Sequence, residues 1–65
     1  MKTLDAASVD GFVGHLPEQI RARVAKELLR MISENRGRPL SLDFVRHWLS
    51  QTGLMLKSEV DAIDL

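Results

Sequence analysis

A periodic apolar stripe between two prolines is the feature that most constrains the fold of this sequence. Apolar residues recur at intervals of four positions, at Ile20, Val24, Leu28 and Ile32. This spacing is typical of a helix that buries one face. Pro17 suits the first helical position, where no N–H is needed, and Gly37 followed by Pro39 is a typical helix end. The pattern predicts a helix over residues 17–36.

A second helix is predicted over residues 41–52. Ser41 precedes it as a candidate N-cap, and Gly53 follows it as a stop. Apolar residues at helical spacing predict one buried face, made of Phe44, Val45, Trp48 and Leu49. A short last helix is predicted over residues 58–64, with Ser58 as its cap and Asp61 in capping-box register.

The N-terminal third allows two interpretations. Apolar residues with the spacing of a short helix follow Ser8, a candidate cap, at Val9, Phe12, Val13 and Leu16. Gly11 and Gly14 weaken the helix by about 1 kcal/mol each relative to alanine, and a strand over residues 12–16 competes with it. We favour the helix. The sequence leaves open whether residues 1–7 are ordered.

These elements place the chain in the all-α class, as three to four short helices in a helical hairpin or small bundle. With 65 residues and no cysteine, residues 1–65 are expected to form one small domain without disulfides. The core is expected where the 17–36 stripe meets the apolar face of residues 41–52. No stretch approaches the roughly 20 apolar residues that span a bilayer, and no signal peptide is evident, so we expect a cytoplasmic chain with no membrane partner.

Charge is balanced overall but unevenly placed. Residues 17–39 hold six Lys or Arg against three Glu, whereas residues 1–16 and 40–65 are both net acidic. A basic middle could face an anionic partner, or it could be neutralised within the fold or across a dimer. The basic side chains Arg23, Lys26 and Arg30 share one face of the first predicted helix. That face is either a contact for nucleic acid or an acidic partner, or an ordinary solvated surface.

Catalytic signatures are missing from the sequence. There is no Cys or Tyr, no phosphate-binding loop and no nucleophile elbow. Asp43 and His47 lie four residues apart, but spacing sets no third ligand for a metal. We therefore expect no enzyme activity, cofactor, metal or small-molecule substrate.

Two local resemblances favour DNA. Arg36-Gly37-Arg38-Pro39 resembles the core of an AT-hook, a family motif whose Arg-Gly-Arg lies extended in the minor groove. The alternative is a glycine cap and a proline stop with two solvated arginines. Residues 12–20 and the helices after them resemble ribbon-helix-helix proteins, which implies a dimer whose strand, here residues 12–16, reads the major groove. That strand lacks the basic and amide residues that read bases.

Apolar residues exceed what a few short helices can cover. Trp48 and the apolar connection after Gly53 are the candidate contacts with a protein partner, namely Trp48, Leu54, Met55 and Leu56. Trp48 could equally fill the core. The leading hypothesis is a small non-enzymatic protein-binding regulator or adaptor, acting as a dimer or within a complex. DNA binding through Arg36 and Arg38, or through a dimeric ribbon, is the alternative.

Overall fold

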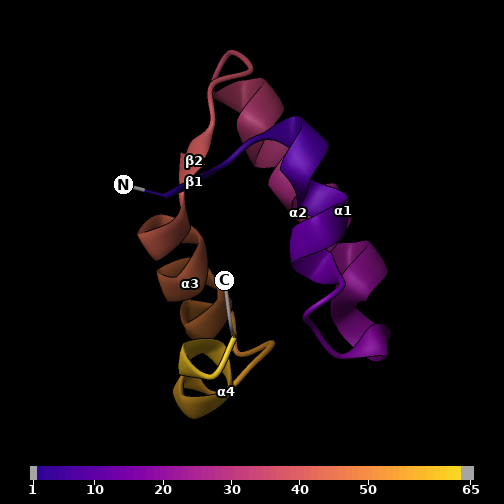
Figure 1. Cartoon of the computed structure of the whole chain (residues 1–65), viewed down its shortest axis with the longest axis vertical. Helices are drawn as coiled ribbons and strands as arrows, with labels where there is room; N and C mark the ends of the chain where they lie inside the picture. The colour runs from indigo at the N-terminus through magenta and orange to yellow at the C-terminus, as the bar shows by residue number, and fades with distance from the viewer. Residues whose placement is uncertain (1, 64–65) are drawn as a thin grey trace.

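A computed structural model describes residues 2–63 of the chain (Figure 1). In order along the chain, the elements are a strand β1 (Thr3–Leu4), a 3-10 turn η1 (Ala6–Ser8), helices α1 (Val9–Val13) and α2 (Glu18–Glu34), a strand β2 (Leu40–Ser41), and helices α3 (Leu42–Gln51) and α4 (Lys57–Asp61). The all-α class is confirmed, with one minimal two-stranded sheet added to it. The last helix begins one residue before the predicted 58–64, and residue 64 lies outside the described residues.

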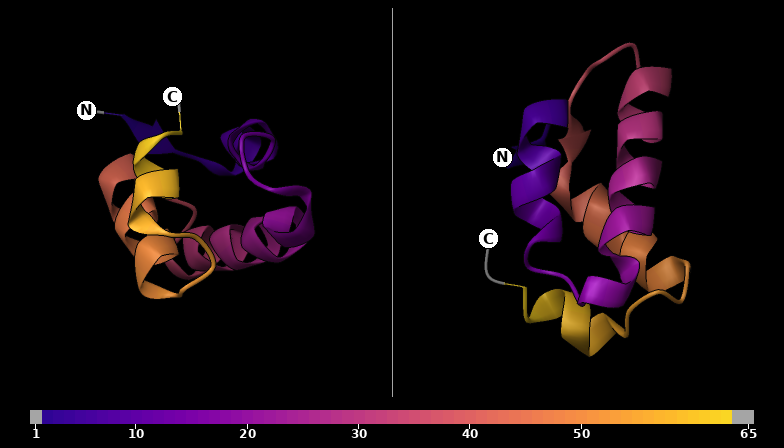
Figure 2. Two further views of the ribbon diagram at one scale, coloured as in Figure 1. Left: turned by 90° about the horizontal axis from the view of Figure 1, so that it is seen from below. Right: turned by 90° about the vertical axis from the view of Figure 1, so that its right-hand side faces the viewer.

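The helices form two pairs. Helix α1 lies along α2, and α4 packs against the end of α3 (Figures 1 and 2). The antiparallel strands join the two pairs, with Thr3 opposite Ser41 and Leu4 opposite Leu40. The Leu42 N–H, which has no partner inside α3, donates to the Lys2 carbonyl at 3.2 Å. The N-terminal segment from Lys2 onward is thus held against the start of α3.

The N-terminal third is helical, which decides between the two interpretations of residues 9–16. Helix α1 ends at Val13 and a turn leads to α2, so residues 12–16 form no strand. The strand on which the ribbon-helix-helix resemblance depends is therefore not in this structure. Ser8 is the N-cap residue of α1, as predicted, but its side chain makes no capping hydrogen bond. Its own N–H donates to the Asp5 carboxylate at 2.9 Å.

The core is apolar throughout. Within residues 2–63 no polar or charged residue is buried, and fifteen apolar residues are. They come from every helix and from both strands, and are Leu4, Val9, Phe12, Val13, Leu16, Val24, Leu28, Ile32, Leu40, Leu42, Val45, Leu49, Met55, Val60 and Ile63. Ile20 and Trp48, which were predicted to be core residues, are half-buried and pack against this cluster.

Phe44 is the clear error in the predicted core. Its side chain is 49% exposed, because α3 buries the face made by Leu42, Val45 and Leu49. These three residues lie at spacings of three and four, whereas Phe44 lies nearly opposite them on the helix. Apolar residues occupy one wide arc of α3, from Phe44 through Trp48 to Leu42, so the sequence allowed either edge of this arc to be the buried one.

The other two predicted caps have different outcomes. Ser41 is the N-cap residue of α3, as predicted, but its side chain makes no capping hydrogen bond. Ser58 was predicted to cap the last helix, but Leu56 holds the cap position of α4. Ser58 lies inside α4, whose start is stabilised by Glu59: its Oε1 accepts the Leu56 N–H at 3.0 Å. This is the carboxylate half of a capping box, without a hydroxyl at the cap position.

Candidate functional site

The outer side of α3 carries an aromatic stripe. We give this name to the residues at spacings of three and four that begin with the exposed Phe44, namely Phe44, His47, Trp48 and Gln51. The stripe holds two of the three aromatic residues of the chain and no Lys, Arg, Asp or Glu. Trp48 is half-buried and contacts the core, while His47 and Gln51 are exposed. The cores of protein interfaces have this composition, rich in aromatic residues and poor in charge.

The connection between α3 and α4 presents less apolar surface than the sequence indicated. Leu56 is 69% exposed and is the most exposed large apolar residue among those described. Leu54 is half-buried against the core, and Met55 is buried within it. Of the four predicted contact residues, Trp48 and Leu56 therefore offer the surface, with a contribution from Leu54. Sequence reasoning missed Phe44, because it was assigned to the core.

The outer face of α2 is charged and partly neutralised by its own residues. Arg23, Lys26 and Arg30 are all exposed on it. The Arg30 guanidinium contacts Glu27 Oε2 at 2.6 Å and Glu34 Oε1 at 3.5 Å. The hydrogen bond that Arg30 donates to Glu27, with the charges of Glu27 and Glu34, raises the pKa of Arg30. Exposed pairs of this kind add little stability, so their main effect is to cancel the charge of Arg30.

The Arg36–Arg38 turn is folded against the end of α2 instead of extended. The Gly37 N–H donates to the Ile32 carbonyl at 2.9 Å, and the Arg36 N–H donates to the Ser33 carbonyl at 3.1 Å. This pair of bonds is a Schellman motif. Its left-handed position is held by Arg36, at φ 60°, and Gly37 follows at φ 76°. An arginine in this conformation costs about 1 kcal/mol more than a glycine would.

The Asp43–His47 pair lies beside a cleft between α3 and α4. The cleft has a volume of about 260 Å³, and both residues line it together with Arg46, Ser50, Lys57, Val60 and Asp61. Among the described residues no three His, Cys, Asp or Glu side chains could jointly hold a metal ion. Arg46 Nε is buried here without a hydrogen-bond partner, which disfavours the folded state.

Comparisons with known proteins identify no relative. The chain matches no protein-family model, and no curated protein and no solved structure matches it. No helix within residues 2–63 is both long enough and apolar enough to cross a bilayer.

Proposed function

We propose that this chain is a small, non-enzymatic, protein-binding regulator or adaptor, and that the aromatic stripe of α3 is its contact surface. The observation that supports this proposal is the exposure of Phe44 beside Trp48 on an uncharged helix face. The chain buries fifteen apolar residues within itself, so its apolar surplus is mostly used. Of the exposed large apolar residues among those described, namely Leu29, Phe44 and Leu56, Phe44 is the one that lies beside the half-buried Trp48 on one helix face.

The size of α3 favours a partner with an apolar groove. Ten helical residues extend about 15 Å. A stable interface buries about 800 Å² on each partner, which is nearly a fifth of the 4497 Å² that this chain exposes. On a flat partner surface, one stripe of a short helix would bury less area than this. In a groove, the partner also covers the two flanks of the stripe, so more area is buried, as in helix-in-groove recognition.

Site-specific photo-crosslinking in the cells that produce the chain tests the proposal. A photoreactive phenylalanine analogue would replace Phe44 in one variant and Leu29 in the other. Both residues are exposed apolar residues on a helix, at 49% and 44%. We expect position 44 to form discrete protein adducts and position 29 to form none. Adducts of the same kind and yield at both positions, or none at position 44, would contradict the proposal.

The mass of the adduct also identifies the kind of partner. A doubled mass means that a second copy supplies the groove, in which case the solution mass of the purified chain should rise with concentration and its melting temperature with it. A different mass means a heterologous complex. We propose the cytoplasm as the location in both cases, in keeping with a chain that has no cysteine.

DNA binding through the Arg36–Arg38 turn is the second candidate. It is favoured by Arg36, which occupies a left-handed position that glycine would take at lower cost. Neither Arg36 nor Arg38 forms an ion pair within the described part of the chain. Binding to A·T-rich duplex should weaken steeply with salt and be lost when both arginines become alanine. Binding that is absent at low salt, or unchanged in that double variant, would exclude this role.

A further inference from the structure

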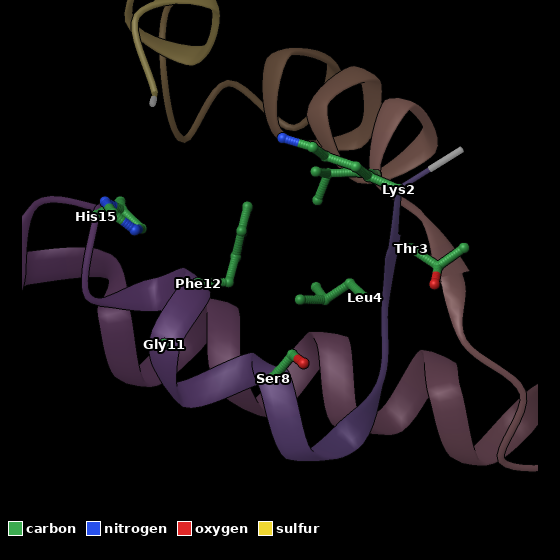
Figure 3. Close-up of a pocket in the computed structure, with 8 residues that line it drawn as sticks. Lys2, Thr3, Leu4, Ser8, Gly11, Phe12 and His15 are labelled. Carbon is green, nitrogen blue, oxygen red and sulfur yellow. The ribbon is translucent and has the colours of Figure 1, made fainter. Parts of the chain in front are cut away.

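A pocket of about 230 Å³ opens between the N-terminal strand, α1 and the start of α3 (Figure 3). Its floor is made of the buried apolar side chains Leu4, Phe12 and Leu42. In Figure 3, Leu4 and Phe12 point into the space between α1 and the N-terminal strand, and His15 lies at one end of it. The pocket is separate from the aromatic stripe, because α3 contributes its buried-face residue Leu42 and none of the stripe residues.

One side of α1 forms a wall of this pocket. Gly11 and Phe12 of α1 line it, together with Ser8 at the end of η1 and His15 in the turn after α1. Gly11 lies at the centre of this wall and of α1 itself. A glycine at the centre of a helix is unfavourable relative to alanine.

Nothing within residues 2–63 requires a glycine at position 11. Its φ is not positive, and a Cβ built there meets no atom within 4 Å. Gly14 differs, because a Cβ there would lie 3.3 Å from the Gly11 carbonyl oxygen. An alanine at position 11 would therefore fit and strengthen α1, but it would project into the pocket. The missing side chain leaves the α1 backbone open to a ligand that approaches from the pocket.

Two of the polar side chains that line the pocket, Ser8 and His15, have no partner in the described part of the chain. Neither the Ser8 hydroxyl nor the His15 ring has a hydrogen bond or ion pair within residues 2–63. Both lie on the same wall as Gly11. A closed cavity of about 150 Å³ holds a benzene molecule, so this pocket of about 230 Å³, which is open to solvent on one side, has room for one substituted aromatic ring.

We infer that this pocket binds a single aromatic ring carrying a hydroxyl group, with the ring over Gly11 and between the apolar floor residues. The hydroxyl would exchange a hydrogen bond with Ser8 or His15. A phenol of this size reaches the pocket either as a free small molecule or as a tyrosine side chain of a peptide. This inference does not depend on the role proposed for α3, since the two sites share no residue.

Titration of the purified, isotope-labelled chain with p-cresol, followed by amide NMR, tests the inference. We expect saturable shifts centred on Ser8, Gly11, Phe12 and His15, with a dissociation constant on the order of 1 mM for so small a ligand. Toluene, which lacks the hydroxyl, should bind more weakly. A titration with no saturation up to the solubility limit, or with shifts spread over the whole chain, would overturn the inference.

The Gly11→Ala variant separates binding from folding. It should melt at the same temperature as the wild type or higher, and its affinity for p-cresol should fall at least tenfold. Ser33→Ala, on the exposed surface of α2, is the matched control and should bind as the wild type does. Unchanged affinity in Gly11→Ala would overturn the inference. A blocked Gly-Tyr-Gly peptide shows where the bound phenol group comes from. If the peptide binds more tightly than p-cresol, the ligand is a tyrosine side chain of a peptide. If it binds more weakly, the ligand is a free phenol.

Discussion

The outer faces of α2 and α3 are both exposed, but they differ in chemistry. The face of α2 carries Arg23, Lys26 and Arg30, and Arg30 is paired with two glutamates of the same helix. The stripe on α3 carries Phe44 and Trp48 with no charged residue. Charged outer faces are normal in a water-soluble helix and need no partner. Phe44 is exposed and Trp48 half-buried, and apolar surface gains nothing from water, so the comparison favours α3 over α2 as the proposed contact face.

Shortening a side chain on the buried side of α3 should lower the free energy of unfolding much more than shortening one on the exposed side. This is the largest effect that we expect. Leu49→Ala removes a fully buried side chain and should lower the free energy of unfolding by about 3 kcal/mol. Phe44→Ala, on the exposed side, should change it by less than about 1 kcal/mol. Urea unfolding of both variants measures the difference. A loss of equal size in Phe44→Ala would mean that Phe44 belongs to the core, and the comparison between the two outer faces would no longer hold.

Replacing Arg46 should stabilise the chain. Arg46 Nε is buried with no hydrogen-bond partner, and such a group costs about 1–3 kcal/mol. Arg46→Met keeps the unbranched apolar stem and removes the unpaired nitrogen, so the free energy of unfolding should rise by about 1 kcal/mol. Arg46→Lys keeps the charge and removes the same nitrogen. If both variants lose stability in urea unfolding, the buried nitrogen has a partner in solution.

In the turn after α2, a glycine should raise the free energy of unfolding at position 36 but not at position 38. Arg36→Gly removes the left-handed arginine and should gain about 0.5–1 kcal/mol in the free energy of unfolding. Arg38→Gly is the control, because Arg38 has no positive φ and glycine there only adds freedom to the unfolded chain. Both variants lose one positive charge, but only Arg36→Gly relieves a left-handed residue. Their melting temperatures therefore distinguish the effect of backbone conformation from the effect of charge. A gain in both variants would attribute the effect to charge.

The ion pairs on α2 should have the smallest effect. Arg30→Gln removes both contacts with Glu27 and Glu34, yet its melting temperature should stay close to that of the wild type, because exposed pairs are screened by water and salt. The raised pKa of Arg30 means that any contribution is complete below the unfolded pKa and is lost only at strongly alkaline pH. A large loss at neutral pH and low salt would show that the α2 face is more than a solvated surface.

The sequence predicted the long elements well and the local details poorly. The stripe at Val24, Leu28 and Ile32 identified α2, because seventeen residues repeat the helical period several times. Strands of two residues have no period to detect, so β1 and β2 were missed. The register of α3 was misjudged because Leu42 and Phe44 are both apolar, and tertiary packing decides which is buried.

The candidate site was only partly predictable for the same reason. Trp48 and Leu56 were selected from the sequence and are accessible, whereas Met55 was selected and is buried. Residue type does not show on which side of a short connection a side chain lies. The pocket beside Gly11 could not be inferred at all, since it joins residues from three distant segments.

The most direct test of the account uses the single tryptophan as a reporter of the aromatic stripe. Trp48 is the only tryptophan, so 5-fluorotryptophan labelling gives one fluorine resonance from the stripe. We predict that this resonance shifts and broadens when the purified chain is added to extract of the cells that produce it. The change should be lost in Phe44→Ser and retained in Lys26→Glu, on the face of α2. A spectrum unchanged by the extract, or a change lost equally in Lys26→Glu, would contradict the assignment of α3 as the binding face.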